Sequence, residues 1–172
     1  ALGMHASAAL SADAATTEPL QPIAALDVPR YMGTWYEIAR YPNWFQKKCV
    51  GDTRADYSLQ ADGRVQVINR CREANGELSE AVGMARQLGA ADSPKLEVRF
   101  APAWLSFLPM VWGDYWVIDL DPDYRLVAVS EPSREYLWVL SRTPAAAPQA
   151  HAAFLAPRAA RGLAPATLAG PP

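Results

Sequence analysis

Turn signals that recur about every dozen residues constrain the fold of this chain more than any other feature of its sequence. Asp62-Gly63 and Asp121-Pro122-Asp123 are typical of tight hairpins, and each separates two runs of alternating apolar residues. We therefore predict eight antiparallel strands, over residues 33–41, 49–59, 64–72, 77–88, 95–101, 113–120, 124–130 and 136–142. Because all neighbours in sequence can pair in space, the simplest all-β fold is an eight-stranded up-and-down β-barrel, which can hold one small ligand.

The alternation within each run predicts which side chains face the inside. In residues 95–100 the apolar set is Leu96, Val98 and Phe100, with charged residues between them, which indicates one dry and one wet face. The run over 77–88 is ambiguous, because one face carries Glu80, Met84 and Arg86 while the other carries Ala81, Gly83 and Ala85.

The last three runs are apolar on both faces, which predicts that something covers them from outside. The stretch 147–161 suits a C-terminal α-helix packed there, with Pro148 in its first turn and Arg158 late in the helix. Because Pro157 interrupts this stretch, the helix should be bent or short.

The two ends differ in composition from the middle, and 172 residues make one domain. Residues 1–26 are rich in Ala, Ser and Thr, and we expect a disordered leader or linker, or the remnant of an export signal. Residues 27–162 should form the barrel and the helix, and 163–172 a flexible tail. No apolar run approaches the roughly 18 residues of a membrane span.

Charge and histidine content argue against several classes of function. The net charge of −2 gives no reason to expect nucleic-acid binding. The two histidines, His5 and His151, lie outside the predicted barrel, so no Ser-His-acid set and no metal cluster can be assembled there. We expect neither catalysis nor a cofactor. Two alternatives stay open: an enzyme that acts on or isomerises lipids with Glu37 and Tyr115 as acid and base, and a module that docks a partner protein.

Three segments resemble a known family. Residues 30–40, Arg-Tyr-Met-Gly-Thr-Trp-Tyr-Glu-Ile-Ala-Arg, resemble the lipocalin signature with its core Gly-x-Trp. Residues 113–118 and 136–144 look like the second and third lipocalin motifs, the third with its hallmark Arg142. Within the family the sequence is most similar to the bacterial outer-membrane lipocalins and apolipoprotein D. The resemblance implies a barrel that binds an apolar ligand, a fatty acid or a lysophospholipid.

Gly33, Trp35 and Arg142 are the structural residues of these motifs. Trp35 begins the first strand and Arg142 ends the eighth, so in an up-and-down barrel both reach the same end. We predict that the Arg142 guanidinium stacks on the Trp35 indole, donates to backbone carbonyls and closes this end.

The opposite end should be the open mouth of the barrel. The loop 102–112 is unusually apolar, and it either lines a pocket, meets a partner, touches lipid or folds down as a lid over a filled core. We predict ligand contacts in the interior and in the mouth loops at Glu37, Trp44, Phe45, Tyr57, Val67, Val98, Phe100, Trp104, Phe107, Met110, Trp112, Tyr115 and Trp138. Lys47 and Lys48 are candidates for an anionic headgroup, and an inward Glu37 needs a partner or stays protonated.

The two cysteines, Cys49 and Cys71, lie in the second and third runs and share the inward parity. We predict that they form a disulfide, with two free buried thiols as the alternative. A regular register places Cys49 opposite a residue beyond Cys71, so a disulfide requires a bulge or a bend in the second strand. A disulfide suits an oxidising compartment, and we expect export to the periplasm or outer membrane of a Gram-negative bacterium. Peripheral membrane contact and a homodimer stay open.

Overall fold

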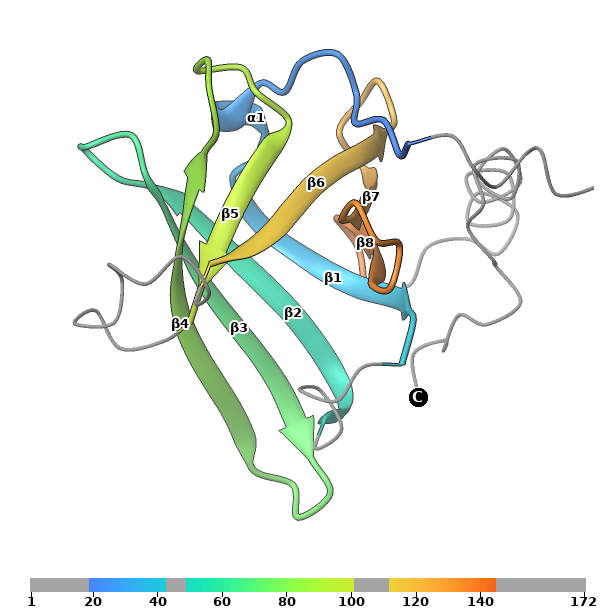
Figure 1. The fold of residues 1–172 in the computed structure, drawn as a ribbon. Coiled ribbons are helices and arrows are strands. Elements are labelled where there is room, and N and C mark those ends of the chain that lie inside the picture. The colour runs from blue at the N-terminus through green and yellow to red at the C-terminus, as the bar shows by residue number, and fades with distance from the viewer. Residues whose placement is uncertain (1–18, 43–48, 101–111, 145–172) are drawn as a thin grey trace, which may run out of the picture.

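The computed structural model describes residues 19–42, 49–100 and 112–144. Figure 1 shows a closed antiparallel barrel in which the strands follow one another in sequence order, which confirms the predicted barrel. The strands are β1 (Gly33–Arg40), β2 (Cys49–Leu59), β3 (Val65–Glu73), β4 (Leu78–Gln87), β5 (Lys95–Arg99), β6 (Gly113–Leu120), β7 (Leu126–Ser130) and β8 (Leu137–Ser141). Pairing of β1 with β8 closes the sheet, so these strands leave no exposed edge.

Buried side chains form two clusters, one on each side of part of the barrel wall. The inner cluster lies inside the barrel and comprises Leu26, Val28, Tyr31, Trp35, Ala55, Tyr57, Val65, Val67, Ala85, Leu96, Val117, Val127, Val129 and Leu140, with Ile23, Met32, Val98, Tyr115, Leu120, Tyr124 and Trp138 packed against it. The outer cluster comprises Leu20, Ile38, Ala39, Ile118, Ala128, Leu137 and Val139. Two clusters explain why the last strands are apolar on both faces.

Part of the cover over the outer cluster comes from the N-terminal side of the barrel. Leu20 is 4% exposed and packs in the outer cluster, and Leu26 is 1% exposed in the inner one. The Ile23 amide donates to the Val117 carbonyl at 3.0 Å, which fixes this segment against β6. We expected residues 19–26 to belong to a disordered leader, but Leu20, Ile23 and Leu26 of this segment pack on the barrel. The predicted helix over 147–161 lies outside the described residues.

One short helix, α1 (Val28–Tyr31), precedes β1. Asp27 caps its N-terminus by accepting the Arg30 amide, and Pro29 suits its first turn. At four residues it is too short for apolar periodicity to predict it. Val28 and Tyr31 are buried, so the helix covers one end of the barrel.

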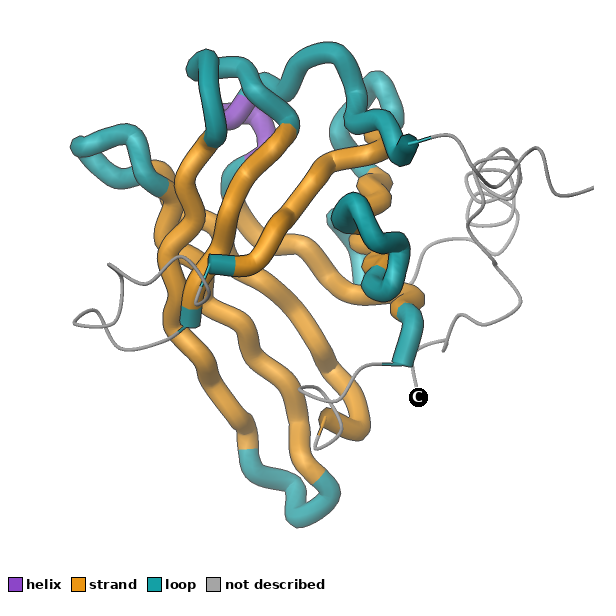
Figure 2. The backbone as a smooth tube through the Cα atoms, in the orientation of Figure 1, coloured by secondary structure: helices purple, strands orange, loops and turns teal. Residues whose placement is uncertain are grey.

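The two ends of the barrel differ in what lies across them. The end with α1 also carries the β2–β3, β4–β5 and β6–β7 turns, as Figures 1 and 2 show. The β3–β4 and β7–β8 turns lie at the other end. Within the described ranges, no helix has the length and apolar character needed to cross a membrane.

Candidate functional site

Arg142 closes the end of the barrel that carries α1. Its guanidinium carbon lies 3.8 Å from the centroid of the Trp35 ring. Its Nε, Nη1 and Nη2 atoms donate to the carbonyls of Tyr124, Thr34 and Arg30 at 3.2, 3.1 and 2.8 Å. Gly33 has φ +101°, and a β-carbon there would meet Nη1 of Arg142 at 3.3 Å. This is the stacking expected from the sequence, with glycine supplying both the left-handed backbone and the room.

The inner wall opens toward the opposite end. Along β5 and at the residue that follows it, the inward side chains become more exposed, from 6% at Leu96, through half-buried Val98, to 41% at Phe100. At the closed end Trp35 is fully buried. The exposed part of the inner wall is a surface that an apolar ligand can cover, and we call the space beside it the lumen.

Small residues of β4 face the inner wall, which resolves the ambiguity of that strand. Ala85 packs in the inner cluster, and Gly83 pairs with inward Val67, so the small set faces inward. A β-carbon on Gly83 would lie 2.6 Å from the Phe100 ring, so the ring rests on the glycine. Ala81 has the same parity and lies nearer the open end.

A bulge in β1 brings a charged pair onto the inner wall. Residues three apart on a regular strand face opposite sides, but the register shifts between Glu37 and Ala39. Glu37 therefore pairs with inward Leu140 and Arg40 with inward Trp138. Nη1 of Arg40 donates to Oε2 of Glu37 at 2.8 Å, with 19% and 9% of the two side chains exposed. Arg40 is thus the partner that an inward Glu37 required.

Three tyrosines meet inside the barrel on the closed side of the lumen. The Tyr115 hydroxyl lies 2.6 Å from that of Tyr31 and 2.9 Å from that of Tyr57. Burial raises the pKa of Tyr57 to about 12, and it raises the pKa of Tyr31 and of Tyr115 well above the ordinary value. All three phenols are therefore neutral donors at physiological pH.

Cys49 and Cys71 form a disulfide with a Cα–Cα distance of 5.5 Å, which confirms that prediction. The expected irregularity is present, because the β2–β3 register shifts between Cys49 and Gly51 and again between Gly51 and Arg54. The two shifts bring Cys49 opposite Glu73, two residues from Cys71. The disulfide therefore ties β2 to β3 away from the closed end.

The structure brings most of the described ligand candidates together. Tyr57, Val67, Val98, Tyr115 and Trp138 belong to the inner cluster or pack on it, and Glu37 and Phe100 lie on the same wall. Outside the described residues lie Trp44, Phe45, Lys47, Lys48, Trp104, Phe107 and Met110.

Trp112 does not join the other candidates. Its ring lies 3.8 Å from the guanidinium carbon of Arg86 and 5.4 Å from that of Arg99. Met84 pairs with Arg99, and both alternate with inward neighbours, so this ring packs on the outside of the wall. Its place in an apolar loop gave no indication of these two arginines.

Sequence reasoning missed three polar residues of the inner wall. Tyr31 comes from α1, which was not expected, and Arg40 faces inward only because of the bulge. Asn69 pairs with Ala55 and Ala81 and was overlooked because it is polar, although strand parity alone places it inside. In the part of the chain that the structure describes, no group of three metal-ligating side chains forms a site.

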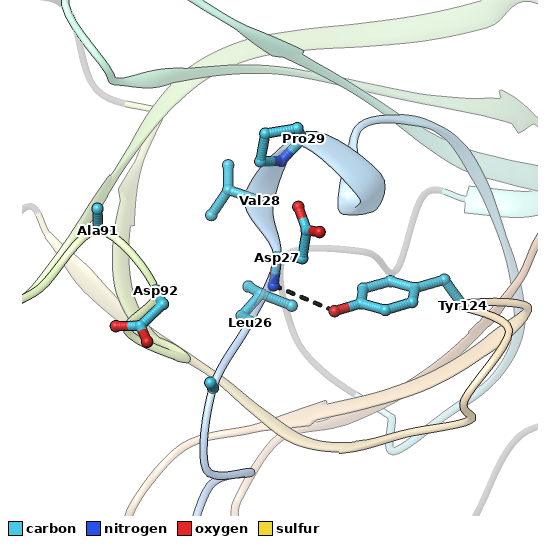
Figure 3. A pocket seen from close by; sticks show the side chains of 8 residues that line it. Leu26, Asp27, Val28, Pro29, Ala91, Asp92 and Tyr124 are labelled. Atoms are coloured by element: carbon cyan, nitrogen blue, oxygen red, sulfur yellow. Dashed lines mark hydrogen bonds between the residues drawn. The ribbon is translucent and has the colours of Figure 1, made fainter.

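An open hollow of about 520 Å³ lies outside the lumen at the closed end. Figure 3 shows it between the segment that leads into α1, the β4–β5 turn and Tyr124, whose hydroxyl accepts the Asp27 amide at 3.1 Å. It is lined by Ala25, Leu26, Asp27, Val28, Pro29, Ala91, Asp92 and Tyr124. Its two carboxylates make it less suited to an apolar or anionic ligand than the lumen.

A family model and several curated relatives match this chain. Residues 26–172 match the model of the lipocalin-like domain family. The chain is 45% identical over 126 residues to temperature-induced lipocalin-1 of Arabidopsis thaliana. The aligned segment covers 72% of this chain and 67% of the plant protein. It is 42% identical over 119 residues to the outer membrane lipoprotein Blc of Escherichia coli K12, covering 69% of this chain and 63% of that protein.

A more distant relative and a solved structure agree with these matches. Mouse apolipoprotein D is 32% identical over 130 residues, covering 72% of this chain and 64% of that protein. The matches thus span about two thirds of the curated relatives' lengths. The structure of insecticyanin from the tobacco hornworm Manduca sexta superposes with a TM-score of 0.68 at 17% identity, over 89% of this chain and 84% of that one, which shows a shared fold.

Proposed function

This chain belongs to the lipocalin family, whose members typically bind small hydrophobic ligands, and we propose that it binds a fatty acid or a lysophospholipid in its lumen. The single observation that carries the proposal is the apolar inner wall that becomes exposed toward one end, from Leu96 to Phe100. Binding removes a hydrocarbon tail from water, at ~0.8 kcal/mol per methylene. A chain of about eighteen carbons gains roughly 14 kcal/mol in this way, so it reaches micromolar affinity, about −8 kcal/mol, after a cost of about 6 kcal/mol for ordering and association.

Arg40 is the described residue best suited to hold an anionic headgroup. A guanidinium has five N–H donors, and the bond to Glu37 uses one at Nη1. Its side chain is 19% exposed beside Trp138, so it can be reached from the lumen. Lys47 and Lys48 stay candidates for the same role.

Carriage or storage without catalysis fits the chemistry of the inner wall. The acid–base pair considered for an enzyme, Glu37 and Tyr115, is divided between two networks, since Glu37 binds Arg40 and Tyr115 binds two phenols. Neither residue is left as a lone base facing a substrate. Mass spectrometry of bound lipid after long incubation tests this point: an unchanged mass supports carriage, and a new product mass supports the enzyme.

The cell envelope of a Gram-negative bacterium is the place we propose for this protein. The Cys49–Cys71 disulfide supports an oxidising compartment, and relatives named outer membrane lipoproteins support the outer membrane. Contact with a membrane surface and pairing of two copies are compatible with an exposed lumen mouth. Fractionation of a producing bacterium tests the location, and recovery in the cytoplasm contradicts it.

A matched pair of variants tests whether ligand enters the lumen. Ala81→Trp places an indole on the inner wall, whereas Val82→Trp places one on the outer face of the same strand, where Val82 is 52% exposed. We expect lauric acid to displace a dansyl-labelled fatty acid from the wild type and from Val82→Trp alike. Ala81→Trp should weaken binding about tenfold or more, since the indole occupies the space of the tail.

Two outcomes contradict the proposal. Equal affinity in Ala81→Trp and Val82→Trp would show that ligand binds elsewhere on the molecule. The absence of saturable displacement by lauric acid and by lysophosphatidylcholine would show that the lumen does not hold lipid at all.

A further inference from the structure

The tyrosine triad, Tyr31, Tyr57 and Tyr115, contains one more hydrogen than its bonds use. Each phenol can donate one hydrogen and accept others, so three hydroxyls bring three hydrogens. They make two contacts, both to Tyr115, and within the described residues they have no further hydrogen-bond partner. Whichever way the hydroxyls rotate, one O–H hydrogen is left over.

The leftover O–H hydrogen lies among largely buried side chains, where solvent water has little access to accept it. Tyr31 is 3% exposed and Tyr57 8% exposed, and both belong to the inner cluster. Their rings pack together, with centroids 5.6 Å apart, so the hydroxyls converge on Tyr115. Tyr115, the third member of the triad, is half-buried on the inner wall of β6, so it is the member most accessible from the lumen. An acceptor that enters through the lumen therefore meets the triad from one side.

We propose that the triad is an inner binding site for an uncharged acceptor oxygen, a carbonyl or an alcohol, carried by the part of the ligand that reaches the closed side of the lumen. This rests on the proposed function, because the ligand must occupy the lumen. The site selects ligands with an oxygen deep in the barrel over ligands with a plain hydrocarbon tail. When a ligand with a deep oxygen also has a charged or polar end, that end stays near Arg40.

The charges around the triad favour a neutral oxygen over an anion. Arg142 lies beyond Tyr31, and its Nε, Nη1 and Nη2 atoms each donate to a backbone carbonyl, so the guanidinium is held at the closed end and its charge acts on the triad only from a distance. Arg40 is bound to Glu37. A carboxylate beside the triad would therefore be buried without direct contact to a guanidinium, which is unfavourable, whereas a carbonyl needs only one donor.

Infrared spectroscopy of a bound ketone tests the site directly. Methyl undecyl ketone is the probe, and tridecane is the matched hydrocarbon without the oxygen. We expect the carbonyl stretch of the bound ketone to lie below its frequency in heptane, because a phenol donates to it. In a variant with all three tyrosines changed to Phe, the stretch should return to the heptane frequency while the ketone still displaces the dansyl-labelled fatty acid.

The control is Tyr36→Phe. This change removes a phenol from the outer face of β1, at the position after inward Trp35, and should leave the shift of the carbonyl stretch unchanged. An unshifted band in the wild type, or a shift that persists in the triple variant through water or other donors, overturns the inference while lipid binding stands. If neither ketone nor tridecane displaces the fluorescent fatty acid, and lauric acid also fails, the inference and the proposed function fall together.

Discussion

At the scale of single residues, one arginine joins segments that are far apart in the sequence. Arg142 reaches carbonyls of α1, of β1 and of the β6–β7 turn, and it covers the Trp35 ring. A planar guanidinium offers donors in a fixed fork, so it can satisfy three carbonyls and stack at once. A lysine ammonium in the same place could not do both, which is why the sequence motif requires arginine there.

Removing this side chain should cost stability. Arg142→Ala leaves three carbonyls without their donors, so we expect the free energy of unfolding to fall by about 3 kcal/mol. Urea unfolding measures it, with Arg125→Ala, an exposed arginine, as the control expected to stay within about 0.5 kcal/mol of the wild type. Affinity for lauric acid should change less than stability does. Equal stability of the two variants would contradict this role of Arg142.

The triad predicts an unusual order of stabilities among phenylalanine variants. Tyr115→Phe removes the partner common to Tyr31 and Tyr57 and leaves two buried phenols unpaired, which should cost about 2 kcal/mol. Changing all three tyrosines to Phe removes the donors together with their partners, so the triple variant should be more stable than the single one. Thermal unfolding of both variants measures the order, and a triple variant less stable than Tyr115→Phe would refute it.

Alkaline pH should destabilise the barrel through the same residues. An unfolded tyrosine has a pKa near 10, whereas the pKa of Tyr57 is about 12 in the folded chain. The folded state therefore keeps a proton that the unfolded state has lost. The resulting stability is fully present below about pH 10 and falls toward about pH 12, by up to ~1.4 kcal/mol per pH unit for each such tyrosine. Urea unfolding across this range should show a shallower decline in the triple-Phe variant.

At the scale of elements, alternation and turn residues predicted the strands. Irregularities within the strands limited how well the inward or outward direction of single residues could be predicted. The predicted bounds differ from the observed ones by at most two residues at an end, because Asp-Gly and Asp-Pro-Asp turns leave little freedom. Parity fails after a bulge, so Glu37 could be placed inside but Arg40 could not. The short helix α1 has no periodicity to detect, and with it Tyr31 was missed.

The irregular part of β2 also explains the disulfide. The two register shifts before Arg54 are needed to bring Cys49 near Cys71, which is why the sequence indicated both the bond and the need for a bulge. The bond closes a loop of 22 residues. Closing such a loop restricts the unfolded chain, so changing both cysteines to Ser should lower the free energy of unfolding by about 3 kcal/mol. Urea unfolding measures this, and reduction of the wild type with dithiothreitol should reproduce the loss; an unchanged midpoint in both cases would contradict it.

At the scale of the whole molecule, the barrel is closed at one end and exposed along its inner wall at the other. A ligand that binds the folded barrel and not the unfolded chain stabilises it by mass action, by about 2.7 kcal/mol at a hundred times its Kd. Lauric acid should therefore raise the Tm by roughly 5–10 °C, given a rise of about 2–4 °C per kcal/mol for a domain of this size. Differential scanning fluorimetry or calorimetry measures the shift.

The origin of that shift can be located with the two tryptophan variants. Ala81→Trp fills space on the inner wall, so its Tm should respond little to lauric acid, while Val82→Trp, on the outer face, should respond like the wild type. Because both variants add the same indole to adjacent positions of β4, a general effect of the substitution would change both responses equally. Equal shifts in the two variants would place the lipid outside the barrel, and the aromatic residues of the inner wall would then have only a packing role.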